Sequence, residues 1–230
     1  MDILPTMTFR TLLGIGLLVG VSSLRADILV TEVMSSSLHP SDGTANDDWF
    51  ELTNTGLSSI DITGWSWDDD SHTAGSANFG SLTSIGAGQS VIITGEAKGT
   101  EAAWLTDWGI SGVTVVALGN ATFQAFGANG DQVNIYNSSN ALVTSVSFGI
   151  ATQGSSFAWD AGGNSLGISV VGQNGAFKAV LNGGNAAPGP GQDIGSPGYV
   201  SPVPEPGTVA LLGAGFGLVL YGFRRRHLLR

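Results

Sequence analysis

The chain has 230 residues, no cysteine and a formal net charge of −10 at pH 7. The absence of cysteine excludes disulfides, thiol nucleophiles and thiolate metal sites. Between Asp27 and Val203, two lysines stand against sixteen acidic residues, a net charge of −14. Because a surface this acidic repels phosphate backbones, nucleic acid is not an expected partner.

The amino-terminal end has the organisation of a signal peptide. Arg10 precedes an apolar stretch at residues 12–21 that is too short to cross a membrane, and Ala26 is a small residue after which a signal peptidase could cut. We therefore expect residues 1–26 to be a signal peptide that directs the rest of a bacterial chain out of the cytoplasm.

From residue 28 onward, short β-strand patterns alternate with turn residues. In residues 48–54, for example, Phe50 and Leu52 share one face of an extended strand and Glu51 lies on the other. Strands are expected at residues 28–33, 48–54, 60–62, 64–67, 90–94, 113–118, 132–136, 142–148, 157–159 and 168–171.

One helix is expected, at residues 100–108, where Thr100 can cap the start and Gly109 can end it. Many short strands with a single helix predict an all-β fold, an antiparallel β-sandwich. No repeat of the length expected for a propeller or a β-helix is visible.

Several of these segments resemble, in order, the lamin tail domain, an immunoglobulin-like sandwich that occurs in nuclear lamins and in many bacterial exported proteins. The resemblance rests on ILVTEV at residues 28–33, DWFELTNTG at 48–56, IDITGW at 60–65, NGDQVNIY at 129–136, residues 143–148 and GSPG at 195–198. It implies an immunoglobulin-like antiparallel β-sandwich, which we expect over residues 27–186.

An acidic run carries residue types that calcium prefers as ligands. Asp68, Asp70 and His72 would face the same way from an extended strand end, with Asp47 or Asp48 as further ligands. The run does not match an EF-hand loop, and a solvated acidic turn is the alternative interpretation. Calcium is thus the one possible cofactor.

The chain contains six tryptophans, many for a domain of this size. Trp49 and Trp65 fall within the segments that resemble the lamin tail domain, so we expect them in the core. Trp67 and Trp108 are the candidates for an exposed platform that stacks on sugars.

The carboxyl-terminal end begins with a glycine- and proline-rich stretch, residues 187–202, that predicts a linker. An apolar segment at residues 208–223 follows and predicts a membrane helix. Its length suits transient anchoring, because about 1.5 Å per residue gives less than the roughly 30 Å of the hydrocarbon core. By the positive-inside rule, the arginines after it stay in the cytoplasm and residues before Val203 lie outside.

This tail, residues 203–230, resembles the PEP-CTERM sorting signals of bacterial exported proteins. The residues that carry the resemblance are Val203, Pro204, Glu205, Pro206, Arg224, Arg225 and Arg226, with the apolar segment between the two groups. The resemblance implies that a membrane-embedded exosortase reads the tail, cuts near the Pro-Glu-Pro element and releases the protein toward the cell surface or the extracellular matrix. An ordinary tail anchor is the alternative.

The sequence favours a non-catalytic function. Bacterial chains with a lamin tail domain often carry a nuclease or phosphatase domain beside it, and this chain has no room for one. A secreted hydrolase is the least favoured alternative, because no Gly-x-Ser-x-Gly motif occurs. We expect a structural or adhesive envelope or matrix protein that contacts another envelope protein, a matrix polysaccharide or itself. The alternative is a carbohydrate- or calcium-dependent binding module.

Overall fold

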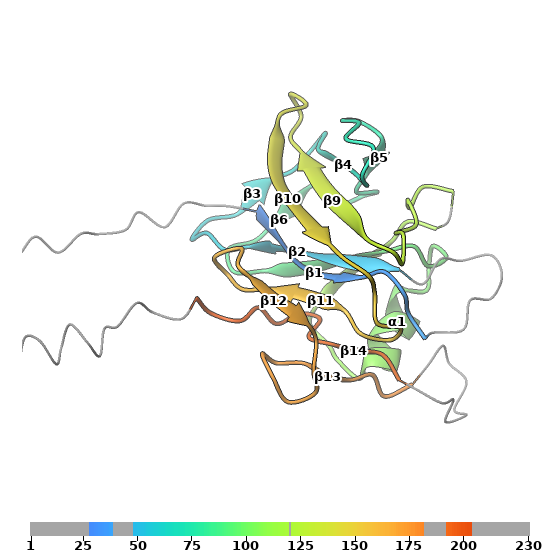
Figure 1. Ribbon diagram of the computed structural model, residues 1–230. Helices are drawn as coiled ribbons and strands as arrows, with labels where there is room; N and C mark the ends of the chain where they lie inside the picture. The colour runs from blue at the N-terminus through green and yellow to red at the C-terminus, as the bar shows by residue number, and fades with distance from the viewer. Residues whose placement is uncertain (1–27, 39–47, 120, 182–191, 204–230) are drawn as a thin grey trace, which may run out of the picture.

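The computed structural model of the protein describes residues 28–38, 48–119, 121–181 and 192–203 (Figure 1). The expected signal peptide, the membrane helix at residues 208–223 and the sorting residues after Val203 lie outside these ranges. Within the described part, no helix is both long enough and apolar enough to cross a membrane.

Two sheets form the body of the protein, as the strand patterns predict. The larger has six strands in the order β12-β11-β1-β2-β7-β8. Its strands are β1 (Ile28–Met34), β2 (Trp49–Asn54), β7 (Ser90–Thr94), β8 (Thr114–Ala117), β11 (Phe157–Trp159) and β12 (Ser165–Ile168). Neighbouring strands are antiparallel except β7 and β8, which are parallel.

The smaller sheet has four antiparallel strands in the order β10-β9-β4-β5. They are β4 (Ser66–Asp68), β5 (Ala77–Asn78), β9 (Asp131–Tyr136) and β10 (Leu142–Phe148). Two further two-stranded sheets pair β3 (Ile60–Asp61) with β6 (Ser84–Ile85) and β13 (Phe177–Lys178) with β14 (Ile194–Gly195). The architecture is the expected immunoglobulin-like sandwich.

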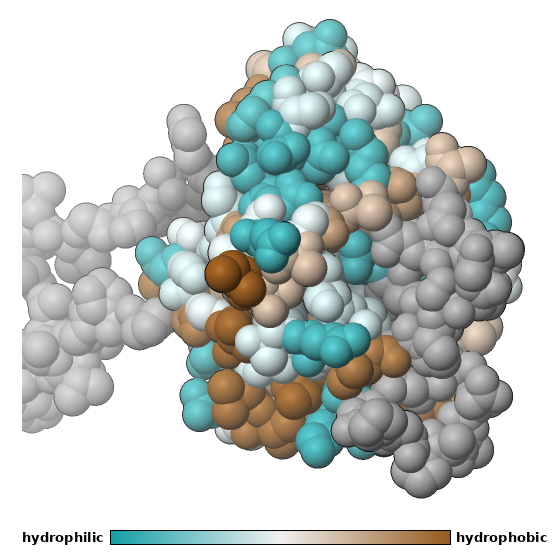
Figure 2. Space-filling model, turned by 45° about the vertical axis from the view of Figure 1, so that its right-hand side comes forward, coloured by the Kyte–Doolittle hydropathy of each residue, from teal (hydrophilic) through white to brown (hydrophobic). Residues whose placement is uncertain are grey.

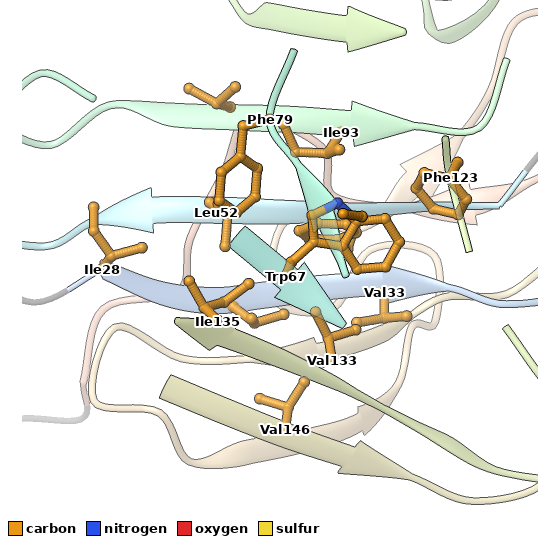
Figure 3. Packing of buried hydrophobic residues seen from close by; sticks show 14 of the residues in the cluster. Ile28, Val33, Leu52, Trp67, Phe79, Ile93, Phe123, Val133, Ile135 and Val146 are labelled. Atoms are coloured by element: carbon orange, nitrogen blue, oxygen red, sulfur yellow. The ribbon is translucent and has the colours of Figure 1, made fainter. Parts of the chain in front are cut away.

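The main core lies between the two sheets. Leu52 and Ile93 point into it from the larger sheet, and Val133 and Ile135 from the smaller, around the fully buried ring of Trp67 (Figure 3). The alternation of apolar residues along each strand delivers these side chains to one face of each sheet.

A second, smaller core covers the outer face of the larger sheet. Helix α1 (Glu101–Trp108) packs Trp104 and Trp108 against Trp49 of β2 and Met34 of β1. Gly109 ends this helix in the left-handed conformation, as expected. The larger sheet is therefore buried on both faces around β2, whose six residues are all buried.

The structure differs from the sequence predictions in the later part of the chain. The strand expected at residues 168–171 lies three residues earlier, as β12. Residues 192–203, most of the expected linker, belong to the folded domain, since Ile194 and Gly195 form β14. The domain therefore extends past the predicted boundary at residue 186.

Candidate functional site

Two glutamates on neighbouring strands lie side by side beneath the end of the folded chain. Glu32 of β1 and Glu51 of β2 are direct partners in the strand register, and neither side chain is exposed to solvent. Partners in an antiparallel pair point to the same face of the sheet. That face is the outer one, opposite the main core.

A β-bulge explains why Glu32 points outward. Val30 and Val33 both belong to the main core, although residues three apart point to opposite faces of a regular strand. The register of β1 against β2 shifts between Val30 and Glu32, which adds the residue needed to bring both valines inward. The same shift places Glu32 opposite Glu51.

The two carboxyl groups hold the end of the folded chain through hydrogen bonds. The backbone N–H of Ser196 donates to Oε1 of Glu32 at 2.7 Å, and its hydroxyl donates to Oε2 at 3.1 Å. The hydroxyl of Ser156 also donates to Oε1 of Glu32, at 2.5 Å. The backbone N–H of Gly198 donates to Oε2 of Glu51 at 2.5 Å. We call Glu32, Glu51, Ser156, Ser196 and Gly198 the chain-end anchor.

Burial raises the pKa of both glutamates well above the usual range. Desolvation, together with the nearby charge of Glu51, raises the pKa of Glu32 to about 8. Desolvation raises the pKa of Glu51 to about 7, against the opposing effect of hydrogen bonds from Thr31 and Gly198. Pairs of carboxyl groups with raised pKa values also occur in sites of acid–base catalysis, but here the oxygens face the protein's own backbone and hydroxyl groups.

Two glycines let the chain approach this pair. A Cβ on Gly195 would lie 2.6 Å from Oε1 of Glu32, so only glycine allows this close passage. Gly198 has a φ of +81°, in the left-handed region, and a Cβ there would lie 2.4 Å from Val113. The GSPG segment at residues 195–198 is therefore shaped for the chain-end anchor.

We expect Gly198→Ala to loosen the chain end. The alanine would have to adopt a left-handed φ, and its Cβ would clash with the Val113 side chain. Overpacking of this kind lowers the free energy of unfolding by about 1–3 kcal/mol. Gly163→Ala is a matched control, because Gly163 has a φ of +77° but open space around it. In thermal melts, the Gly198→Ala protein should have a lower melting temperature than the Gly163→Ala protein. Equal melting temperatures would contradict the close packing of the chain end.

The predicted calcium ligands are not assembled as a set. The Asp68 side chain is buried and accepts hydrogen bonds from the backbone N–H of Thr73 at 2.7 Å and the hydroxyl of Ser71 at 2.9 Å. Although burial opposes ionisation, these bonds lower the pKa of Asp68. Asp70 and His72 are exposed. The described residues contain no group of three or more acidic or histidine side chains that could hold a metal ion.

The predicted sugar platform is wrong. Trp67 is completely buried, with its ring 4.9 Å from those of Phe50 and Phe123, and Trp108 is 4 % exposed within the second core. Trp67 points into the main core, and Trp108 is buried because α1 packs it against Trp49 on the outer face of the larger sheet. Trp49 is in the core as expected, whereas Trp65 is half-buried at its margin.

Sequence reasoning missed the chain-end anchor. It placed Glu51 on the polar face of its strand and assigned no role to Glu32. The available signal was an acidic residue within each of two strongly apolar strands, ILVTEVM and WFELTN. Carboxylates in such segments are either exposed or supplied with several donors, and only the fold shows which.

Comparison with known proteins places these observations in context. A family model for the lamin tail domain matches residues 22–149, more than half of the chain. A second model, for the PEP-CTERM protein-sorting motif, matches residues 202–226. No curated protein matches the chain. The lamin tail match ends before β11, so β11 to β14 and the end of the anchor lie beyond it.

Proposed function

The chain belongs to the lamin tail domain family, and from this we propose that it is a non-catalytic structural or adhesive module of the cell surface or extracellular matrix. Its PEP-CTERM motif marks it as an exported protein that an exosortase-type enzyme sorts at the membrane. The proposal concerns what the sandwich does after sorting.

The proposal rests on one observation: the buried carboxyl groups accept hydrogen bonds from the protein's own chain. Glu32 and Glu51 bind the chain's own Ser196 and Gly198. Asp160 accepts hydrogen bonds from the backbone N–H groups of Gly162 and Asn164, which order the turn before β12. Groups that could serve as general acids or bases are thus engaged in holding the fold, which favours a structural role.

The position of the chain-end anchor adds support. Gly198 lies four residues before the start of the sorting-motif match at residue 202. A folded sandwich held this close to the motif is suited to be the cargo that sorting delivers. The sandwich then contacts whatever surrounds it at the surface.

Stepwise washing of surface material tests the proposal. The full chain is produced in its native host, and the surface and extracellular fractions are washed first with high salt and then with denaturant. Adhesion through packed surfaces predicts that the sandwich resists salt and leaves only with denaturant. Free protein in the medium, with none held in the surface fraction, would contradict it.

A further inference from the structure

Strand β10 leaves one edge of the smaller sheet open. It pairs with β9 on one side, and no other described strand pairs with its second side. With seven residues, Leu142–Phe148, it is the longest edge strand of the two main sheets in the described part of the chain. Its unpaired edge offers a row of backbone donors and acceptors to another strand.

Apart from a register shift between Leu142 and Thr144 at its start, this edge lacks the charged residues and prolines that usually protect edge strands. Residues 132–159 contain no charged residue and no proline, within a domain whose net charge is −14. Leu142 is 55 % exposed and Ile150, just past the strand, is 74 % exposed. Lysine, proline or inward-pointing charge would normally discourage pairing at such an edge.

The two main sheets also differ in width on this side. β10 lies against β1, so β11 and β12 continue beyond it (Figure 1). Phe157 of β11 faces the smaller sheet, with its ring 5.2 Å from that of Phe148. Ile168 of β12 is the register partner of Phe157 and so points the same way, yet it is 38 % exposed. A strand added to β10 would cover it.

Apolar side chains gather on the surface of this half of the chain. The space-filling view shows brown patches below a hydrophilic upper part (Figure 2). Six of the large apolar side chains exposed in the described part lie between residues 142 and 171: Leu142, Val143, Ile150, Ile168, Val170 and Val171.

We propose that β10 pairs antiparallel with β10 of a second copy of this chain, which joins the two smaller sheets across a two-fold axis. The absence of charge along β10 makes a second copy a suitable occupant. Two copies repel each other through their acidic surfaces, and an uncharged strand is a place where they can meet without opposing like charges. Each copy then supplies the strand that covers Ile168 of the other. This inference rests on the proposed structural role and names the chain itself as the partner.

Cysteine cross-linking in the full chain tests this pairing, because the protein has no cysteine of its own. Val143→Cys, Ser145→Cys and Ser147→Cys are produced separately in the native host, and the surface fraction is treated with a mild oxidant. All three positions are exposed on β10. Opposed residues of an antiparallel pair bring Cβ atoms to about 4.5–5.5 Å, close enough for a disulfide after small adjustments.

At least one of the three variants should form a disulfide-linked dimer on a non-reducing gel. Ser84→Cys, on the exposed end of β6, is the matched control and should stay monomeric. Adding Ser145→Lys to a cross-linking variant at position 143 or 147 should lower the dimer yield about fivefold, because it puts a charged lysine on the pairing edge of both copies, and edge lysines discourage strand pairing. If Ser145→Cys is the only variant that cross-links, the lysine is introduced as Val143→Lys instead.

Monomers in all three β10 variants would overturn the proposal, as would dimers that the added lysine leaves unchanged. Failure here is distinct from failure of the structural role. A chain that does not cross-link but still resists salt washing keeps that role with a different partner. A chain that neither cross-links nor stays with the surface fraction loses both.

Discussion

The protein should lose stability as the pH rises from about 5 to about 9, because two buried glutamates hold protons in the folded state that the unfolded chain releases. Glu32 has a pKa raised from 4.5 to about 8, and Glu51 from 4.5 to about 7. The folded state therefore retains protons that the unfolded chain releases above about pH 4.5, and stability falls until both folded pKa values are passed.

Other carboxyl groups act in a different pH window. The pKa values of Asp68 and Asp160 are lowered, because hydrogen bonds to each carboxylate outweigh the burial that opposes ionisation. Their contribution is present above the ordinary pKa of aspartate and is lost only as the pH falls below it. Stability should therefore be greatest near pH 5, between the two effects.

Glu32→Gln should remove most of this pH dependence. The glutamine keeps an oxygen that can accept the Ser196 N–H, but it cannot ionise, so only the smaller pKa shift of Glu51 remains. Glu101→Gln, in the first turn of α1, is the control and should leave the slope unchanged. Thermal melts of the recovered protein at pH 5, 7 and 9 measure the effect. A melting temperature at pH 9 equal to or above that at pH 5 would contradict the buried-pair account.

Replacing Pro204, Glu205 and Pro206 with alanine should hold nearly all of the protein at the membrane. These residues lie within the sorting-motif match. Proline disfavours a helix and favours an extended backbone. Alanines would let a helix extend toward the sandwich and would remove the feature that the sorting enzyme reads. Immunoblots of membrane and extracellular fractions measure the change.

A matched control loses prolines outside the motif. Pro188→Ala with Pro190→Ala removes two prolines from the same glycine-rich region but lies before the match at residues 202–226. This double variant should be sorted as the unaltered chain is. If the triple alanine variant reached the extracellular fraction equally well, recognition of the Pro-Glu-Pro element would be refuted.

Periodicity predicted the longer strands because they alternate regularly and end at turn residues. β2, β7 and β10 lie within one residue of their predicted bounds. β5, β6, β13 and β14 were missed, since two residues carry no pattern. They form where tertiary contacts bring backbone groups together.

The end of the domain was misplaced for a related reason. Glycine and proline at residues 187–198 are typical of linkers, but Gly195 and Gly198 serve a close approach and a left-handed turn. Composition does not distinguish a flexible segment from one whose glycines are required by packing. The lamin tail resemblance included GSPG as an ending, and this was the better guide.

The candidate site depended most on the fold. The burial of Glu32, Glu51 and Trp108 does not follow from the alternation of apolar and polar residues. A strand pattern does not show whether the second face of the sheet is exposed to solvent or covered. The sorting motif, by contrast, is a linear signal. It was predicted from the sequence, and the family comparison confirms it.

The most direct test of the account is the intact mass of the native protein, measured separately from membranes and from extracellular material. Sorting and release predict an extracellular form that ends near Pro204 to Pro206 and lacks Val209 onward. If the protein were found solely as a membrane-bound form that still carries Arg230, the account would be contradicted, because the tail would then be a permanent anchor.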